Sequence, residues 1–231
     1  MKKRLISLLL AFSMMLTFLP AGAVSAFAEG TADDTTKGTL LSDGQPITTG
    51  GTYRLRGTYT KAIKIDTSAP VTINIAEGDE VSFKPEEHAG LNVLLYVVTN
   101  SDLTVNNNGV YKGPTFLCIS TKSANAKVTI NGGRYNITKQ FNVETCAFDF
   151  EVGGSDENPI VVDGVYIEAG LDCTGIEACG APKVMIKNST INVLGTEYGG
   201  EGAINLEGSK TSVKLENVTA HATNNSTITI G

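Results

Sequence analysis

The sequence is poor in the residues that most often build ligand pockets and nucleic-acid surfaces. Its 231 residues include no Trp and only two His, and aromatic residues make up 6% of the chain, so an aromatic-rich pocket is not expected. Basic residues are also scarce, because 18 Lys and Arg stand against 24 Asp and Glu, a net charge of −6. We therefore expect no nucleic-acid partner held by a basic surface. The apolar content of 41% is too high for a disordered chain.

The longest apolar run lies at the N-terminus. Three basic residues at positions 2–4 precede the mostly apolar run Leu5–Leu19, and Ala26 and Ala28 flank Phe27. This order predicts a secretory signal peptide cleaved after Ala28, whereas a membrane anchor would need a longer uncharged run. Cleavage would leave 15 basic and 24 acidic residues. We expect an acidic protein that is secreted, extracellular or on the cell surface, with no membrane insertion of the mature chain.

Five segments of alternating apolar residues are each followed by Asn or Gly. These positions are Asn107, Gly132, Gly164, Asn188 and Asn217, separated by 25, 32, 24 and 29 residues. Gly, and next best Asn, adopts positive φ at low cost. The column therefore predicts a structural corner with left-handed backbone that recurs five times.

Two further sets of short strands follow the same irregular spacing. One set gives the column Ile119, Phe150, Ile176, Leu206 and Ile230, and the other gives the inward column Tyr135, Ile167, Ile191 and Ala220. The strands before the corners give a third column, Val105, Ile130, Val162, Ile186 and Leu215. Three short strands per 24–32 residues predict an all-β fold, a right-handed parallel β-helix solenoid of about six turns. A β-sandwich is the alternative, but it has no reason to repeat Gly or Asn at one corner.

This pattern resembles the pectin-lyase-like β-helix superfamily, whose corners often carry stacked Asn. The resemblance covers roughly residues 62–231, and the short strands of residues 47–75 resemble the opening of secreted Gram-positive β-helix proteins, some of which are labelled carbohydrate-binding. The expected organisation is a signal peptide at 1–28, a leader at 29–46, an N-terminal cap and first turn at 47–75, and the β-helix at 76–231.

The last residues, Thr227–Gly231, have the pattern of a core strand. An open solenoid end is a template for strand pairing. We therefore expect either that the natural chain continues or that this edge is covered by another copy or a partner, which includes self-association.

Acidic residues follow three strands of the second set. If the strands stack as aligned above, a candidate acidic ladder forms from Asp149, Glu151, Glu177 and Glu207. Carboxylates about 5 Å apart repel one another unless a cation or solvent relieves them. The ladder could hold Ca²⁺, supply the carboxylate pair of a glycoside hydrolase or face a sugar polymer. The alternative is a solvated outer face, and no cofactor is otherwise indicated.

Four cysteines lie in the predicted β-helix, at Cys118, Cys146, Cys173 and Cys179. An exported chain can form disulfides, but small buried cysteines in a stacked core explain the pattern equally well. A zinc site is not expected, because no pair has Cys-x-x-Cys spacing and the only His are His88 and His221.

The resemblance implies catalytic features that this sequence lacks. The related lyases use an Arg or Lys base beside Ca²⁺-bound carboxylates, but the last Arg is Arg134, and the Asn-Thr-Asp, Asp-Asp and Gly-His-Gly motifs of related hydrolases are absent from the predicted helix. We assign no catalytic residue and expect a non-enzymatic extracellular or cell-surface module, adhesin-like or polysaccharide-binding, whose partner is an extracellular polysaccharide or a host or cell-surface glycan. The alternatives are a polysaccharide lyase or glycoside hydrolase acting on an acidic glycan, and a purely structural assembly unit.

Overall fold

The computed structural model describes residues 37–87, 91–141, 145–194, 202–223 and 228–230. The predicted signal peptide lies outside these residues. Among the described residues, no helix is long and apolar enough to cross a membrane.

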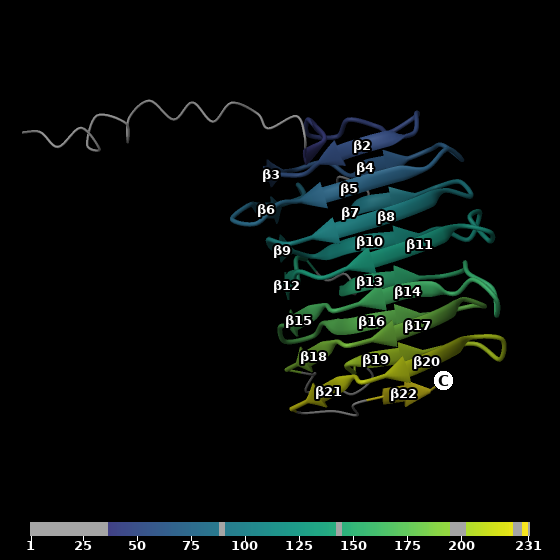
Figure 1. Ribbon diagram of the computed structural model, residues 1–231. Coiled ribbons are helices and arrows are strands. Elements are labelled where there is room, and N and C mark those ends of the chain that lie inside the picture. The colour runs from purple at the N-terminus through teal and green to yellow at the C-terminus, as the bar shows by residue number, and fades with distance from the viewer. Residues whose placement is uncertain (1–36, 88–90, 142–144, 195–201, 224–227, 231) are drawn as a thin grey trace, which may run out of the picture. The chain divides into compact units, whose positions relative to one another are not determined.

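The described chain forms three parallel β-sheets that stack strand upon strand (Figure 1). Sheet A has eight strands, in the order β1-β2-β5-β8-β11-β14-β17-β20, sheet B has seven, in the order β22-β19-β16-β13-β10-β7-β4, and sheet C has seven, in the order β21-β18-β15-β12-β9-β6-β3. From β2 onward the chain visits A, then C, then B, and repeats this order. The fold is therefore a parallel β-solenoid, as the strand spacing predicted.

The strands are short, with two to six residues each. Sheet A comprises β1 (Thr39–Leu40), β2 (Gly51–Arg54), β5 (Val71–Ile75), β8 (Asp102–Asn107), β11 (Lys127–Asn131), β14 (Ile160–Asp163), β17 (Lys183–Lys187) and β20 (Ser212–Glu216). Sheet B comprises β4 (Ile63–Ile65), β7 (Val93–Val97), β10 (Thr115–Ile119), β13 (Cys146–Phe150), β16 (Thr174–Ala178), β19 (Ile204–Leu206) and β22 (Ile228–Ile230). Sheet C comprises β3 (Gly57–Tyr59), β6 (Glu80–Phe83), β9 (Val110–Gly113), β12 (Arg134–Ile137), β15 (Tyr166–Ala169), β18 (Thr190–Val193) and β21 (Thr219–Ala222).

The core consists of columns of inward side chains, one from each strand. Two predicted columns are confirmed by the strand register, namely Val105, Ile130, Val162, Ile186 and Leu215 in sheet A, and Tyr135, Ile167, Ile191 and Ala220 in sheet C. Alternating apolar residues place one side chain of every pair inside, because successive side chains of a strand point to opposite faces. Aromatic rings fill part of the interior, and Phe116 contacts both Tyr111 and Tyr135 edge-on.

The corner between sheets A and C is left-handed at four of the five predicted positions. Gly132 and Gly164 both have φ of 68°, Asn188 has 50° and Asn217 has 53°. At each of these corners two residues separate the strands, and one of the two must take positive φ to turn the chain. The prediction is confirmed at these four positions.

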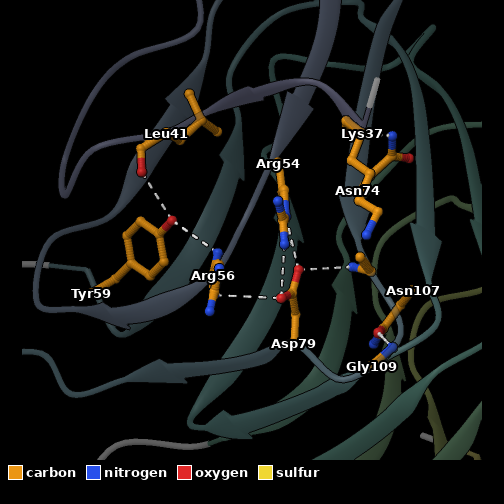
Figure 2. Close-up of polar contacts among 10 residues, drawn as sticks. Lys37, Leu41, Arg54, Arg56, Tyr59, Asn74, Asp79, Asn107 and Gly109 are labelled. Atoms are coloured by element: carbon orange, nitrogen blue, oxygen red, sulfur yellow. Dashed lines mark hydrogen bonds and ion pairs between the residues drawn. The ribbon is translucent and has the colours of Figure 1, made fainter. Parts of the chain in front are cut away.

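At Asn107 the prediction of a left-handed corner is wrong. This residue is still part of β8. Three residues lie between Asn106 of β8 and Val110 of β9, whereas only two lie between their register partners in the next turn, Asn131 and Arg134. The extra residue lets the chain turn without positive φ at Asn107. Its side chain is fully buried instead, and its Oδ1 accepts a hydrogen bond from the Gly109 amide at 2.9 Å (Figure 2).

Amide side chains along this corner bond from turn to turn. Asn131 Nδ2 donates to Asn106 Oδ1 at 3.0 Å, and Asn106 Nδ2 donates to Asn74 Oδ1 at 3.1 Å. Further along, Asn217 Nδ2 donates to Asn188 Oδ1 at 3.1 Å. These bonds hold successive turns in register.

Part of the expected leader belongs to the solenoid. Residues Thr39–Leu40 pair with β2, while Leu41 and Ile47 are buried against the first strands. Tyr59, which is also buried, donates its hydroxyl hydrogen to the Leu41 carbonyl at 3.0 Å. These residues cover the apolar interior at the N-terminal end of the sheets.

A buried ion pair reinforces the same end (Figure 2). Arg54 Nε and Nη2 donate to the two carboxylate oxygens of Asp79, each at 2.9 Å, and both side chains are almost fully buried. The Ala76 amide also donates to Asp79 Oδ2 at 3.2 Å, and Arg56 Nε lies 3.5 Å from Oδ1. Burial alone would raise the pKa of Asp79, but the contacts with Arg54 and Ala76 bring it below its usual value.

Candidate functional site

The outward face of sheet B carries the predicted acidic residues, in a different arrangement from the one expected. In register order its outward column runs through Tyr96, Cys118, Asp149, Glu177 and Asn205. Asp149 and Glu177 are therefore direct neighbours on β13 and β16. A thiol precedes them and an amide follows them.

The predicted stacking of Phe150, Ile176 and Leu206 is wrong. Phe150 lies beside Ala178, and Ala178 lies beside Leu206, whereas Ile176 pairs with Phe148 and Ile204. The prediction was displaced by two residues at β16. Such a shift keeps every side chain on its correct face, so alternation alone could not detect it.

The corrected register divides the predicted ladder. The residues that follow Phe150, Ala178 and Leu206 are Glu151, Cys179 and Glu207, so a thiol separates the two carboxylates. Glu151 also has a local partner, since its Oε2 accepts a hydrogen bond from the Thr121 amide at 2.8 Å. Three glutamates in a single stack do not form.

The register instead produces two clusters of one thiol and two carboxylates. Ligand atoms of Cys118, Asp149 and Glu151 lie within 4.8 Å of one another, as do those of Glu177, Cys179 and Glu207. Calcium takes six to eight oxygen ligands, so a mixed sulfur and oxygen set suits it poorly. Three ligands of this kind are closer to what a zinc ion accepts.

The thiols of these clusters are held in the protonated form. Burial, together with the neighbouring carboxylates, raises the pKa of Cys118 and of Cys179 far above its usual value. Cys179 Sγ donates to Glu177 Oε1 at 3.2 Å. A metal ion would have to displace these protons before a thiolate could bind it.

The four cysteines form no disulfide. Cys146 and Cys173 are buried and belong to adjacent turns, but Cys146 lies opposite Thr174 rather than Cys173. Of the two interpretations left open by the sequence, the structure supports small buried side chains for this pair.

The outward face of sheet C carries a second polar row, which the sequence analysis did not single out. Register places Lys112, Asn136, Glu168, Asn192 and His221 side by side on β9, β12, β15, β18 and β21. Each of these residues comes directly after an inward residue of the same strand. That inward residue is Tyr111 on β9 and a member of the correctly predicted column on the other four strands. The signal was present in the sequence, one residue beyond each inward position.

Hydrogen bonds fix the centre of this row. Arg134 Nη2 lies 2.6 Å from Glu168 Oε2, and the Tyr166 hydroxyl donates to Glu168 Oε1 at 3.1 Å. Asn192 Nδ2 donates to the same Tyr166 hydroxyl at 3.3 Å, and the Arg134 guanidinium lies 4.9 Å from the centre of the Tyr166 ring. The hydrogen bond from Arg134 lowers the pKa of Glu168, so this carboxylate is ionised at neutral pH.

An open hollow of about 370 Å³ lies along the row. Its polar lining includes Asn136, Glu168, Asn192 and His221, and its apolar lining is Ile137, Ala169, Val193 and Leu194. Apolar walls with a few placed polar groups are typical of ligand sites.

Exposed apolar side chains lie on the connections that lead from sheet C to sheet B. Phe141, Leu171 and Leu194 are all exposed and come from three successive turns of the solenoid. Leu194 also lines the hollow. The row therefore combines polar groups with nearby apolar surface.

Comparison with known proteins identifies no relative. No family model, no curated protein and no solved structure matches this chain.

Proposed function

We propose that this chain is an exported module of the pectin-lyase-like type, located outside the cell or on its surface, that binds polysaccharide along sheet C without cleaving it. The observation that carries the proposal is the in-register row Lys112, Asn136, Glu168, Asn192 and His221 beside an open hollow. The N-terminal pattern typical of a signal peptide supports export.

A row of this kind suits a polymer of repeating units. Amide and imidazole groups both donate and accept hydrogen bonds, and an ionised carboxylate accepts them, as sugar hydroxyls require. Strands stack about 4.8 Å apart, so successive turns present these groups at regular intervals. The exposed side chain of Leu194 offers contact surface for the less polar face of a sugar ring.

The central contacts reduce the entropic cost of binding. Glu168 is held by Arg134 and Tyr166, and Tyr166 in turn accepts a hydrogen bond from Asn192. Side chains that are already ordered lose less freedom when a ligand arrives. An adhesin-like role is consistent with such a preformed polar face.

One observation favours hydrolysis of an acidic glycan as the second candidate function. Carboxylate oxygens of Asp149 and Glu151 lie within 4.8 Å of each other, as do those of Glu177 and Glu207. Retaining glycoside hydrolases hold two carboxyl groups about 5–5.5 Å apart. The missing lyase and hydrolase motifs argue against this candidate.

A glycan array combined with a polysaccharide-degradation screen, run with and without Ca²⁺, tests the proposal. Binding without release of reducing or unsaturated ends is expected. Asn192→Ala should weaken binding, whereas Thr129→Ala, an outward polar change on sheet A, should not. Release of chain ends that Glu177→Gln abolishes would establish the enzyme instead, and unaltered binding by Asn192→Ala would remove sheet C as the binding face.

A further inference from the structure

The hollow on sheet C has a single Asp, Glu, Lys or Arg among the described residues that line it. That residue is Glu168, and the other polar lining groups include the amides of Asn136 and Asn192 and the imidazole of His221. The hydrogen bond from Arg134 lowers the pKa of Glu168, so its carboxylate is negative at neutral pH. A negatively charged ligand would therefore meet a carboxylate, and neither Lys nor Arg, in this lining.

The basic side chains of the turns that form the hollow are already paired with carboxylates. Strands β12, β15, β18 and β21, with the described residues that follow each of them before the next strand, contain only two, Arg134 and Lys139. Arg134 Nη2 lies 2.6 Å from Glu168 Oε2, and Lys139 Nζ lies 3.3 Å from Asp172 Oδ2. Neither pair has a net charge, so neither attracts an anionic polymer.

The hydrogen-bonding groups that remain available in the hollow are uncharged. Asn136 Oδ1 accepts a hydrogen bond from Arg134 Nε at 3.3 Å, and Asn192 Nδ2 donates to the Tyr166 hydroxyl at 3.3 Å. Within the described part of the chain, Asn136 Nδ2 and Asn192 Oδ1 have no partner. A sugar hydroxyl both donates and accepts and can therefore satisfy either atom, whereas an ionised carboxylate accepts only and cannot satisfy Asn192 Oδ1.

We propose that the polysaccharide bound along sheet C is neutral, so that hydroxyl groups rather than carboxylates or ammonium groups meet the side chains of the hollow. This inference rests on the proposed glycan-binding function. A uronic acid would bring a second carboxylate to Glu168 without an unpaired Lys or Arg to offset the repulsion. An amino sugar would bring its ammonium group to a carboxylate that Arg134 already neutralises. The net charge of −6 adds a long-range repulsion of polyanions.

Derivatives of one polymer backbone test the preference for a neutral ligand. Each neutral polysaccharide that binds on the glycan array is compared, by isothermal titration calorimetry at pH 7 and low salt, with its carboxymethylated, aminoethylated and hydroxyethylated forms. The hydroxyethyl group is neutral and of similar size, so it controls for steric effects. We expect the carboxymethylated form to bind on the order of tenfold more weakly than the hydroxyethylated form, and added salt should reduce this difference. The aminoethylated form should also bind more weakly than the hydroxyethylated form.

These measurements separate this inference from the proposed function. If a carboxymethylated or aminoethylated form bound as tightly as the hydroxyethylated form, the preference for neutral polymers would be overturned while glycan binding stood. The same holds if the array retained only acidic or amino polymers. If no polysaccharide bound at all, the proposed function would fail, and this inference would fail with it.

A pair of variants tests whether the charges at the hollow set the preference. Glu168→Gln leaves the Arg134 guanidinium without its carboxylate, so the affinity for the carboxymethylated form relative to the hydroxyethylated form should rise on the order of tenfold. Glu216→Gln is the matched control: it causes the same change in net charge, but its carboxylate pairs with Lys214 on sheet A at 2.6 Å. Its affinity ratio should equal that of the wild type.

Both substituted side chains are exposed, at 42% for Glu168 and 46% for Glu216, so circular dichroism should show unchanged folding. An unaltered ratio in Glu168→Gln would overturn the inference. An equal rise in both variants would also overturn it, because the net charge of the chain, rather than the hollow, would then determine the preference.

Discussion

Removal of the buried Asp79 carboxylate tests the energetic account of the N-terminal end most directly. Asp79→Asn keeps the shape of the side chain but leaves the buried Arg54 without its bidentate carboxylate, in which both bonds measure 2.9 Å. Breaking a buried pair by removing one partner costs about 3–5 kcal/mol. The amide oxygen retains one acceptor, so we expect a loss near the lower limit, about 3 kcal/mol.

A matched control lies one residue further along the chain. Glu80 pairs with Lys112 at 2.6 Å, but both side chains are exposed. Exposed pairs contribute about 0–1 kcal/mol, so Glu80→Gln should change the free energy of unfolding by less than about 1 kcal/mol. Equilibrium unfolding in urea measures both variants, and with an m-value of about 2 kcal/mol per molar the Asp79→Asn midpoint should fall by about 1.5 M.

The pH dependence supplies the sign of the effect. Because the folded pKa of Asp79 is lowered, its charge stabilises the fold above the ordinary aspartate pKa of about 3.9, and this contribution is lost as pH falls through the folded value. The difference in free energy of unfolding between the wild type and Asp79→Asn should be constant from about pH 5 to 8 and should disappear in acid. Equal losses for Asp79→Asn and Glu80→Gln at neutral pH would refute the reasoning.

Two further predictions concern backbone strain and thiol reactivity. Gly133→Ala should lower the melting temperature much more than Gly57→Ala. Both positions have positive φ, but a Cβ at Gly133 would meet Asn107 Nδ2, whereas a Cβ at Gly57 would meet no heavy atom within 4 Å apart from its chain neighbours. Similar melting temperatures for the two variants would contradict the packing at this corner. Burial and the Glu177 carboxylate raise the pKa of the Cys179 thiol, so its reaction with Ellman's reagent should still be accelerating above about pH 10, where an ordinary thiol is already ionised, with Cys179→Ser as the blank. A rate that levels off by about pH 10 would show that the thiol ionises normally, with a pKa of about 8.5.

The solenoid could be predicted because its signals are local and repeated. Alternating apolar residues gave the inward columns of sheets A and C, and Gly and Asn gave four of the five corners. Asn107 was misassigned because the extra residue of its corner becomes apparent only when both flanking strand pairs are in register. Residue type alone could not distinguish a left-handed Asn from a buried one.

The candidate site was harder to predict, for two physical reasons. Ile176 and Ala178 are both small enough and apolar enough to face inward, so the sequence could not decide which of them lies beside Phe150. That choice determined whether the ladder would consist of carboxylates alone or of a thiol together with carboxylates. On sheet C, the hydrogen bond from Arg134 to Glu168 depends on side-chain conformations, which no spacing encodes.

The proposed glycan site on the outward face of sheet C repeats once per turn of the solenoid. A polysaccharide long enough to contact several turns should therefore bind more tightly than a short oligosaccharide that contacts one. Asn192→Ala should weaken binding of both, because Asn192 lines the hollow beside the row. If Asn192→Ala left the binding of both unchanged, the row on sheet C would not be the glycan site.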